Sequence, residues 1–191
     1  MTPIGIDDMA FYAPKLYLDI RTLAAKRDIP YEKLSQGLGL LKMAVCDTHE
    51  DAATMAAEAI AELIERNHLD PRQIGRIYLG TESALDMAKP TGTYAVEMLS
   101  QRFSKRFGSG CFRHCDVLDM TFACIGAADA LQNTLDWVGA GRDRFVDGGS
   151  IGLRGQPGEQ GVLGDPVETL DVDRHAVDHE REPGAVLIRD V

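Results

Sequence analysis

DMTFACIGAA, residues 119–128, joins a short apolar run to a helical pattern and carries a cysteine at the junction. The apolar residues that follow recur at the three- and four-residue steps of one helix face: Ala128, Leu131, Leu135 and Val138. Cys124 is therefore expected at or near a helix N-terminus, where free backbone N–H groups and the helix dipole stabilise a thiolate. Taken alone, the stretch favours a buried structural cysteine, because free cysteine is often buried. The alternative is a nucleophile.

Composition limits the classes of protein to which the chain can belong. Its 191 residues are 45% apolar and 26% charged, which is typical of one soluble globular domain. A net charge of −10 argues against a nucleic-acid partner, and the sequence has no apolar run of the roughly 18 residues that a membrane span needs. The N-terminus lacks the pattern of a signal peptide, and the cysteines lack the paired spacing of a disulfide framework, so we expect a cytoplasmic protein.

The cysteines also bear on metal binding. Cys111 and Cys115 lie four residues apart with His114 between them, but no second pair of ligands follows at a suitable spacing. The sequence therefore predicts no metal site.

Strand-like and helix-like patterns alternate along the first three quarters of the chain, which predicts an α/β fold. The expected strands are residues 4–12, 74–80 and about 115–120. The expected helices are residues 19–27, 31–41 with a break at Gly37 and Gly39, 50–67, 91–107 and 125–138.

A second candidate group, Glu82, comes directly after the expected strand 74–80. Parallel strands end at one edge of a sheet, so Glu82 and Cys124 are expected to lie close together although 42 positions separate them. A carboxylate beside a thiolate suits removal of a proton next to a carbonyl group. Considered alone, Glu82 is more simply interpreted as a solvated loop carboxylate.

The last quarter of the sequence has a different character. Residues 148–164 contain seven glycines, an acidic stretch follows, and the next strand-like run is Ala185-Val186-Leu187-Ile188. Such a long segment without apolar periodicity predicts loose order or non-native sequence over 145–183. We therefore expect a domain over residues 1–144 and a divergent tail over 145–191, which would follow from a shifted reading frame, truncation or local divergence.

An ordered set of short matches resembles the amino-terminal half of the 3-hydroxy-3-methylglutaryl-CoA (HMG-CoA) synthases, condensing enzymes of the thiolase superfamily. The first matches are Ile4-Gly5-Ile6, Tyr12, Pro14, Gly37-Leu38-Gly39, Met43, Cys46, Glu50-Asp51, Glu65-Arg66-Asn67 and Ile74-Gly75-Arg76. The later ones are Gly80-Thr81-Glu82-Ser83, Asp86, Lys89, Asp119, Thr121, Ala123-Cys124, Gly126, Asn133 and Trp137. The resemblance covers about residues 4–144.

The resemblance implies the N-terminal half of a thiolase-like fold and a two-step reaction. Cys124 would accept an acetyl group from acetyl-CoA as a thioester. Glu82 would then act as general acid/base, so that the acetyl methyl carbon adds to acetoacetyl-CoA. The family implies no cofactor beyond these CoA thioester substrates, a homodimer, and a place in the mevalonate route to isoprenoids.

The family also places its catalytic histidine in a carboxy-terminal half that this sequence lacks. The five histidines, at 49, 68, 114, 175 and 179, do not match its motif, so the isolated chain is expected to be inactive in condensation. Three alternatives stay open. The chain is a non-catalytic thiolase-like half domain, a β-branching relative from polyketide assembly, or a ketoacyl synthase, which Glu82 in Gly-Thr-Glu-Ser disfavours.

Overall fold

The computed structural model describes residues 4–141 and 184–190, which belong to two compact units. Described residues 4–12, 49–141 and 184–190 form the first unit, and residues 13–48 form the second. The tail 145–183, for which loose order was predicted, lies outside the described residues. Within the described ranges, no helix combines the length and the apolar character that crossing a membrane requires.

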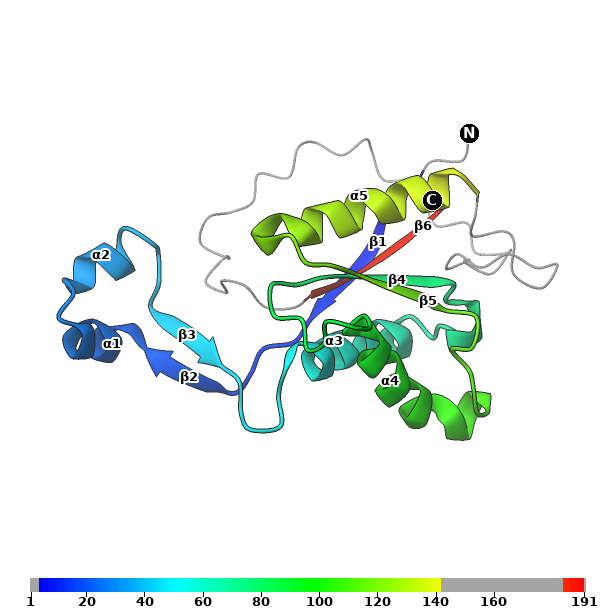
Figure 1. The fold of residues 1–191 in the computed structure, drawn as a ribbon, viewed down its shortest axis with the longest axis horizontal. Helices are drawn as coiled ribbons and strands as arrows, with labels where there is room; N and C mark the ends of the chain where they lie inside the picture. Colours follow the sequence, from blue (N-terminus) through cyan, green and yellow to red (C-terminus); the bar gives the residue numbers. More distant parts are fainter. Residues whose placement is uncertain (1–3, 142–183, 191) are drawn as a thin grey trace. The chain divides into compact units, whose positions relative to one another are not determined.

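The first unit contains two pairs of strands and three long helices. Strand β1 (Ile4–Phe11) pairs antiparallel with β6 (Gly184–Asp190), and β4 (Arg76–Gly80) pairs parallel with β5 (Asp116–Met120). The helices are α3 (Ala52–Arg66), α4 (Gly92–Phe107) and α5 (Gly126–Gly139). Figure 1 shows α5 on one side of β4 and β5, with α3 and α4 on the other. The predicted α/β class is confirmed, and the strand-like run at 185–188 lies within β6.

The core of this unit lies where α3 and α4 pack together and against β4. The alanine-rich face of α3 lets α4 approach closely, and α4 contributes the buried side chains of Ala95, Leu99 and Phe103. Leu79 of β4 and the short 3-10 turn Pro71–Gln73 complete the core, with Ile74 just after the turn. Side chains from distant parts of the sequence thus pack against β4 and hold in place the strand that leads to Glu82.

Helix α3 begins two residues later than the predicted range 50–67. Its N-cap is Asp51, whose carboxylate accepts a hydrogen bond from the Thr54 N–H at 2.8 Å. The Thr54 hydroxyl in turn accepts from the Asp51 N–H at 2.7 Å, which completes a capping box. Sequence reasoning placed Thr48 and Asp51 in such a box. The reciprocal partner of Asp51 is instead Thr54, three residues later, whose hydroxyl takes the place of the glutamate that is usual in a capping box.

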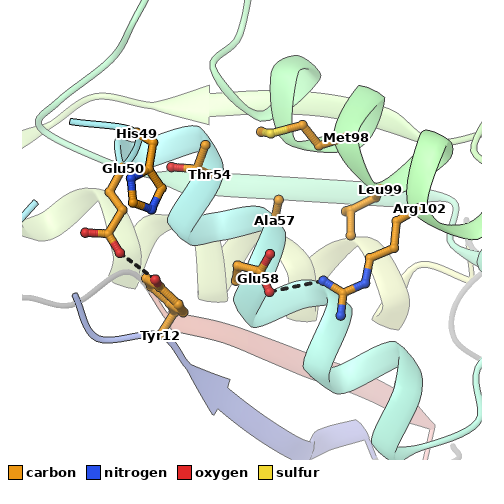
Figure 2. Close-up of a pocket in the computed structure, with 9 residues that line it drawn as sticks. All are labelled: Tyr12, His49, Glu50, Thr54, Ala57, Glu58, Met98, Leu99 and Arg102. Atoms are coloured by element: carbon orange, nitrogen blue, oxygen red, sulfur yellow. Dashed lines mark hydrogen bonds and ion pairs between the residues drawn. The ribbon is translucent and has the colours of Figure 1, made fainter. Parts of the chain in front are cut away.

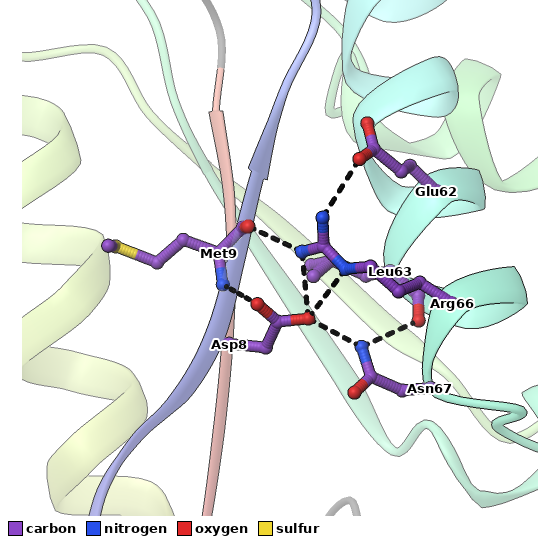
Figure 3. Close-up of polar contacts among 6 residues, drawn as sticks. All are labelled: Asp8, Met9, Glu62, Leu63, Arg66 and Asn67. Carbon is purple, nitrogen blue, oxygen red and sulfur yellow. Dashed lines mark hydrogen bonds and ion pairs between the residues drawn. The ribbon is translucent and has the colours of Figure 1, made fainter.

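A polar cluster ties α3 to β1 (Figure 3). Arg66 donates two hydrogen bonds to Asp8 Oδ2, at 2.9 and 2.7 Å, and one to the Met9 carbonyl oxygen. Asn67 donates to the same carboxylate oxygen at 2.7 Å. The hydrogen bonds from Asn67 and Arg66 lower the pKa of Asp8. The cluster lies beside an irregularity in the pairing of β1 with β6, between Ile6 and Asp8.

The second unit is a small α/β element built around an antiparallel pair, β2 (Leu16–Asp19) and β3 (Lys42–Val45). Helix α1 (Ile20–Arg27) begins after Asp19, which caps it as predicted by accepting from the Thr22 N–H at 2.9 Å. Helix α2 covers Tyr31–Ser35, so the helix expected over 31–41 ends just before its predicted break at Gly37 and Gly39. Neither β2 nor β3 was predicted, because four-residue strands carry too little periodicity.

Candidate active site

Cys124 lies in the turn between β5 and α5. A 3-10 turn, Ala123–Ile125, follows the strand by two residues, and α5 begins at Gly126. The predicted position at a helix N-terminus is therefore confirmed, and the cysteine is exposed rather than buried. Ala123 has a φ of 52°, in the left-handed region that residues with a Cβ rarely adopt. The backbone thus takes an uncommon conformation just before Cys124, whose thiol is exposed.

Glu82 follows β4 and meets Cys124 at the carboxyl edge of the parallel pair. The Cys124 Sγ donates a hydrogen bond to Glu82 Oε1 at 3.0 Å. The approach of these two side chains across 42 positions was predicted from strand order, and the geometry confirms it. Their roles as nucleophile and as general acid/base stay predictions.

Two glycines let the backbones beneath this pair come into contact. A Cβ at Gly80 would lie 2.4 Å from the Ala127 nitrogen, and a Cβ at Gly126 would lie 2.4 Å from the Met120 carbonyl oxygen. Real Cβ atoms do not approach backbone atoms so closely. A side chain at Gly80 would push β4 away from α5, and one at Gly126 would push α5 away from the end of β5. The Thr81 N–H also donates to the Met120 carbonyl oxygen at 3.1 Å. The end of β4 is therefore fixed against the turn that carries Cys124.

The loop that carries Glu82 is held by its own polar side chains. Asp86 accepts from the Ala88 N–H at 2.7 Å and from the Tyr94 hydroxyl at 2.8 Å, and these hydrogen bonds lower its pKa. The Lys89 ammonium group lies 3.8 Å from the centre of the Tyr94 ring. Asp86 and Lys89, both part of the sequence resemblance, thus anchor the loop to α4.

Apolar side chains stand in solvent around the pair. Phe122 is 60% exposed and Ile125 57%, on either side of Cys124, and Leu85 and Met87 are exposed on the Glu82 loop. Sequence reasoning missed this rim, and the signal was present: Phe122 and Ile125 lie outside the apolar periodicity of α5. Such a rim suits a ligand or chain segment that combines apolar surface with a carbonyl group.

The other cysteines have different surroundings. Cys111 is buried in the α3–α4 core, and Cys46 is exposed in the second unit. Burial, with a smaller contribution from the Asp116 charge, raises the pKa of the Cys115 thiol to about 12. Among the described residues, no group of three or more His, Cys, Asp or Glu side chains is arranged to hold a metal ion. His175 and His179 lie outside the described residues.

A separate hollow of about 350 Å³ opens between α3 and α4 (Figure 2). Its polar side chains bind one another: Tyr12 donates to Glu50, and Arg102 donates to Glu58 at 3.0 Å. Arg102 also pairs with Glu65, at 3.1 Å. Neither Glu82 nor Cys124 lines this hollow. The Arg102 pairs join α4 to α3, and the Tyr12 hydrogen bond joins the segment after β1 to the segment before α3, so we interpret the hollow as part of the scaffold.

Comparison with known proteins gives one consistent family. The family model described as "Hydroxymethylglutaryl-coenzyme A synthase N terminal" matches residues 2–161. A hydroxymethylglutaryl-CoA synthase of Haloferax volcanii is 37% identical over 193 residues, which cover 96% of this chain and 42% of that protein. One of Schizosaccharomyces pombe is 33% identical over 154 residues, covering 78% of this chain and 32% of that protein.

The fold agrees with the sequence matches. A solved structure described as MvaS in complex with 3-hydroxy-3-methylglutaryl coenzyme A is 32% identical, with a TM-score of 0.63. The similarity covers 73% of this chain and 31% of that one. The chain thus spans less than half the length of the relatives it matches. The family match across most of the chain and the thiolase-like architecture lead to one conclusion: the chain belongs to the hydroxymethylglutaryl-CoA synthase family.

Proposed function

We propose that this chain supplies the acyl-transfer half of a hydroxymethylglutaryl-CoA synthase, with Cys124 as the acetyl acceptor and Glu82 as the general acid/base. The observation that carries the proposal is the 3.0 Å hydrogen bond between Cys124 Sγ and Glu82 Oε1. A thiol that already points its proton at a carboxylate needs little rearrangement to lose it.

In the first step, Glu82 takes the thiol proton as the sulfur attacks the carbonyl carbon of acetyl-CoA. The bond from that carbon to the CoA sulfur breaks, and Glu82 returns the proton to the departing CoA thiolate. Cys124 then carries the acetyl group as a thioester, and Glu82 is again a carboxylate. Backbone N–H groups at the start of α5 are suited to stabilise the oxyanion of this step.

In the second step, Glu82 removes a proton from the acetyl methyl group. That carbon is two bonds from Cys124 Sγ, and so within reach of a carboxylate that lies 3.0 Å from the sulfur. The carbanion bonds to the ketone carbon of acetoacetyl-CoA, and the resulting alkoxide takes a proton from a separate acid, for which the family uses the histidine of its carboxy-terminal half. Glu82 gives up the proton it took from the methyl group to water and is again a carboxylate. Water then cleaves the thioester, which frees the Cys124 thiol and releases 3-hydroxy-3-methylglutaryl-CoA.

The wider assignments follow from this chemistry and from the family. CoA thioesters are the expected ligands, and no further cofactor is needed because the thioester itself activates the methyl group. The reducing cytoplasm suits a working thiol at Cys124. A homodimer is expected from the family, and the exposed apolar rim around Cys124 supports cover by further protein surface.

The first step, transfer of the acetyl group from acetyl-CoA to Cys124, tests the proposal with this chain alone. The chain is incubated with isotopically labelled acetyl-CoA, quenched in acid and digested, and the labelled peptide is identified by mass spectrometry. We expect the label on the peptide that contains Cys124. No label at all, or a label on a peptide containing Cys46, Cys111 or Cys115, would contradict the assignment.

A further inference from the structure

A chain of hydrogen bonds links the strand that leads to Cys124 with the loop that carries Glu82. It starts at Asp119 on β5, five residues before Cys124. The Asp119 carboxylate accepts from the Thr91 N–H at 2.5 Å and from the Gly92 N–H at 3.1 Å. It therefore caps the N-terminus of α4 from another segment of the chain.

This capping leaves the side chain of Thr91 available for a different contact. Threonine at an N-cap usually bonds the first turn of its own helix, but Thr91 makes no such bond. Its hydroxyl oxygen accepts instead from the Leu85 N–H at 2.9 Å, three residues beyond Glu82. Thr91 is the one fully buried polar side chain among the described residues, at 0% exposure. A buried hydroxyl in this position holds its partner firmly.

We propose that Asp119 and Thr91 are positioning residues, which hold the Glu82 carboxylate against the Cys124 thiol through Leu85. The inference rests on the proposed function for its purpose, but not for its geometry. Glu82 lies between two fixed points: the Thr81 N–H bonds the Met120 carbonyl oxygen before it, and the Leu85 N–H bonds Thr91 after it. Both fixed points lead back to β5, the strand that sets the place of Cys124.

This chain of hydrogen bonds from Asp119 through Thr91 to Leu85, which we call the relay, can be tested through the reactivity of Cys124, without any CoA ester. Alkylation by iodoacetamide requires the thiolate, which a neighbouring carboxylate disfavours. Replacing Glu82 with glutamine should therefore speed alkylation of Cys124 at pH 7 by about tenfold. If Thr91 holds Glu82 in place, Thr91→Val should shift the rate the same way, by at least about threefold, because valine keeps the shape and lacks the acceptor.

Matched variants separate positioning from general destabilisation. Thr91→Ser keeps the acceptor oxygen and should react at the wild-type rate. Thr93→Val is the control within α4, because the Thr93 hydroxyl donates to the Pro90 carbonyl oxygen and not to the Glu82 loop. Asp119→Ala should resemble Thr91→Val, since α4 loses its cap and Thr91 its fixed place. Each variant is first compared with the wild type by thermal melting, so that rates are measured on folded chains.

A second route covers the case in which the buried variants do not fold. Leu85 is 46% exposed, so Leu85→Pro removes the donor N–H without disturbing the core, and Leu85→Ala keeps that N–H as its control. We expect faster alkylation for the proline variant only. A wild-type rate in folded Thr91→Val or Leu85→Pro, alongside a shifted rate in Glu82→Gln, would overturn the relay. An unchanged rate in Glu82→Gln would overturn it as well. Failure of acetyl labelling with the expected alkylation pattern would count against the proposed function alone.

Discussion

Two carboxylates of the first unit each meet a side chain distant in the sequence, yet their surroundings differ. The Asp8 carboxylate is saturated with hydrogen bonds: Asn67 and Arg66 donate to one oxygen, and the Met9 N–H donates to the other. Glu82 faces a thiol on an exposed turn, and close backbone contacts at Gly80 and Gly126 support the two segments that carry the pair. The saturated cluster joins two elements of the scaffold, whereas the second arrangement leaves a nucleophilic atom at the surface. The comparison identifies Cys124 and Glu82 as the candidate site on physical grounds.

Removing the nucleophile should have the largest effect. Cys124→Ala should abolish acetyl labelling from acetyl-CoA, a loss of at least about 10²-fold, because no other group can form the thioester at this turn. Cys46→Ala removes the other exposed thiol and should label as the wild type does. Labelling that survives in Cys124→Ala would show that the thiol beside Glu82 is not the acetyl acceptor. The contrast between Glu82 at a reactive site and Asp8 in the scaffold would then fail.

The thiols themselves should differ strongly in reactivity. With a pKa of about 12, Cys115 is almost entirely protonated at pH 8, so its thiolate fraction is about a thousandfold below that of an ordinary thiol. We expect iodoacetamide to modify the exposed Cys124 well before Cys115, measured by peptide mapping over time. Urea should bring Cys115 to an ordinary rate, since unfolding ends its burial. Comparable rates in the folded chain would contradict the burial that the structure gives Cys115.

Adding one methyl group should test the backbone contacts beneath the site. Gly126→Ala or Gly80→Ala places a Cβ 2.4 Å from a backbone atom, so we expect a loss of about 1–3 kcal/mol in the free energy of unfolding. Gly139→Ala is the matched control in α5, because its Cβ would meet only the Ile4 side chain, at 3.4 Å. That variant should be neutral or more stable by up to about 1 kcal/mol. Urea denaturation of the three variants makes the comparison, and equal stabilities would contradict it.

Much of the first unit could be predicted from sequence because its elements are long and periodic. Helices α3, α4 and α5 carry apolar faces over fourteen or more residues, and each begins within two residues of its predicted start. Strand order then brought Glu82 and Cys124 to one edge. The predicted pairing of these residues depended on topology, and topology follows from the alternation of strands and helices.

What sequence reasoning missed depends on contacts between distant backbones or on very short elements. The four-residue strands β2 and β3 form by pairing with each other, and each is too short to carry a local signal. The left-handed Ala123 is not a residue that usually marks a positive φ, and tertiary packing imposes that conformation. Thr91 could have been noticed as a hydroxyl residue at a helix start, but its buried contact with the Glu82 loop required the fold.

The saturated carboxylate offers the finest test of the comparison, through the pH dependence of stability. The hydrogen bonds from Asn67 and Arg66 lower the pKa of Asp8 in the folded chain below its ordinary value of 3.8. A lowered pKa stabilises the folded state at pH values above 3.8, and this contribution is lost as the pH falls through the folded pKa. Asp8→Asn should therefore be less stable than the wild type at pH 7, and the difference should shrink below about pH 4.

The effect of Asp8→Asn on stability should be the smallest of the four predicted effects. The Asp8 and Arg66 side chains are 28% and 44% exposed, so water screens their charges. Urea midpoints measured from pH 7 to pH 3 would give the difference at each pH. Asn67→Ala is the informative second variant: it removes the leading cause of the lowered pKa while the carboxylate stays. Its difference from the wild type should also narrow in acid, but less completely, since Arg66 still donates to Asp8. A difference that stays constant from pH 7 to pH 3 would show that Asp8 acts through shape alone, and the contrast with Glu82 would then lose its electrostatic basis.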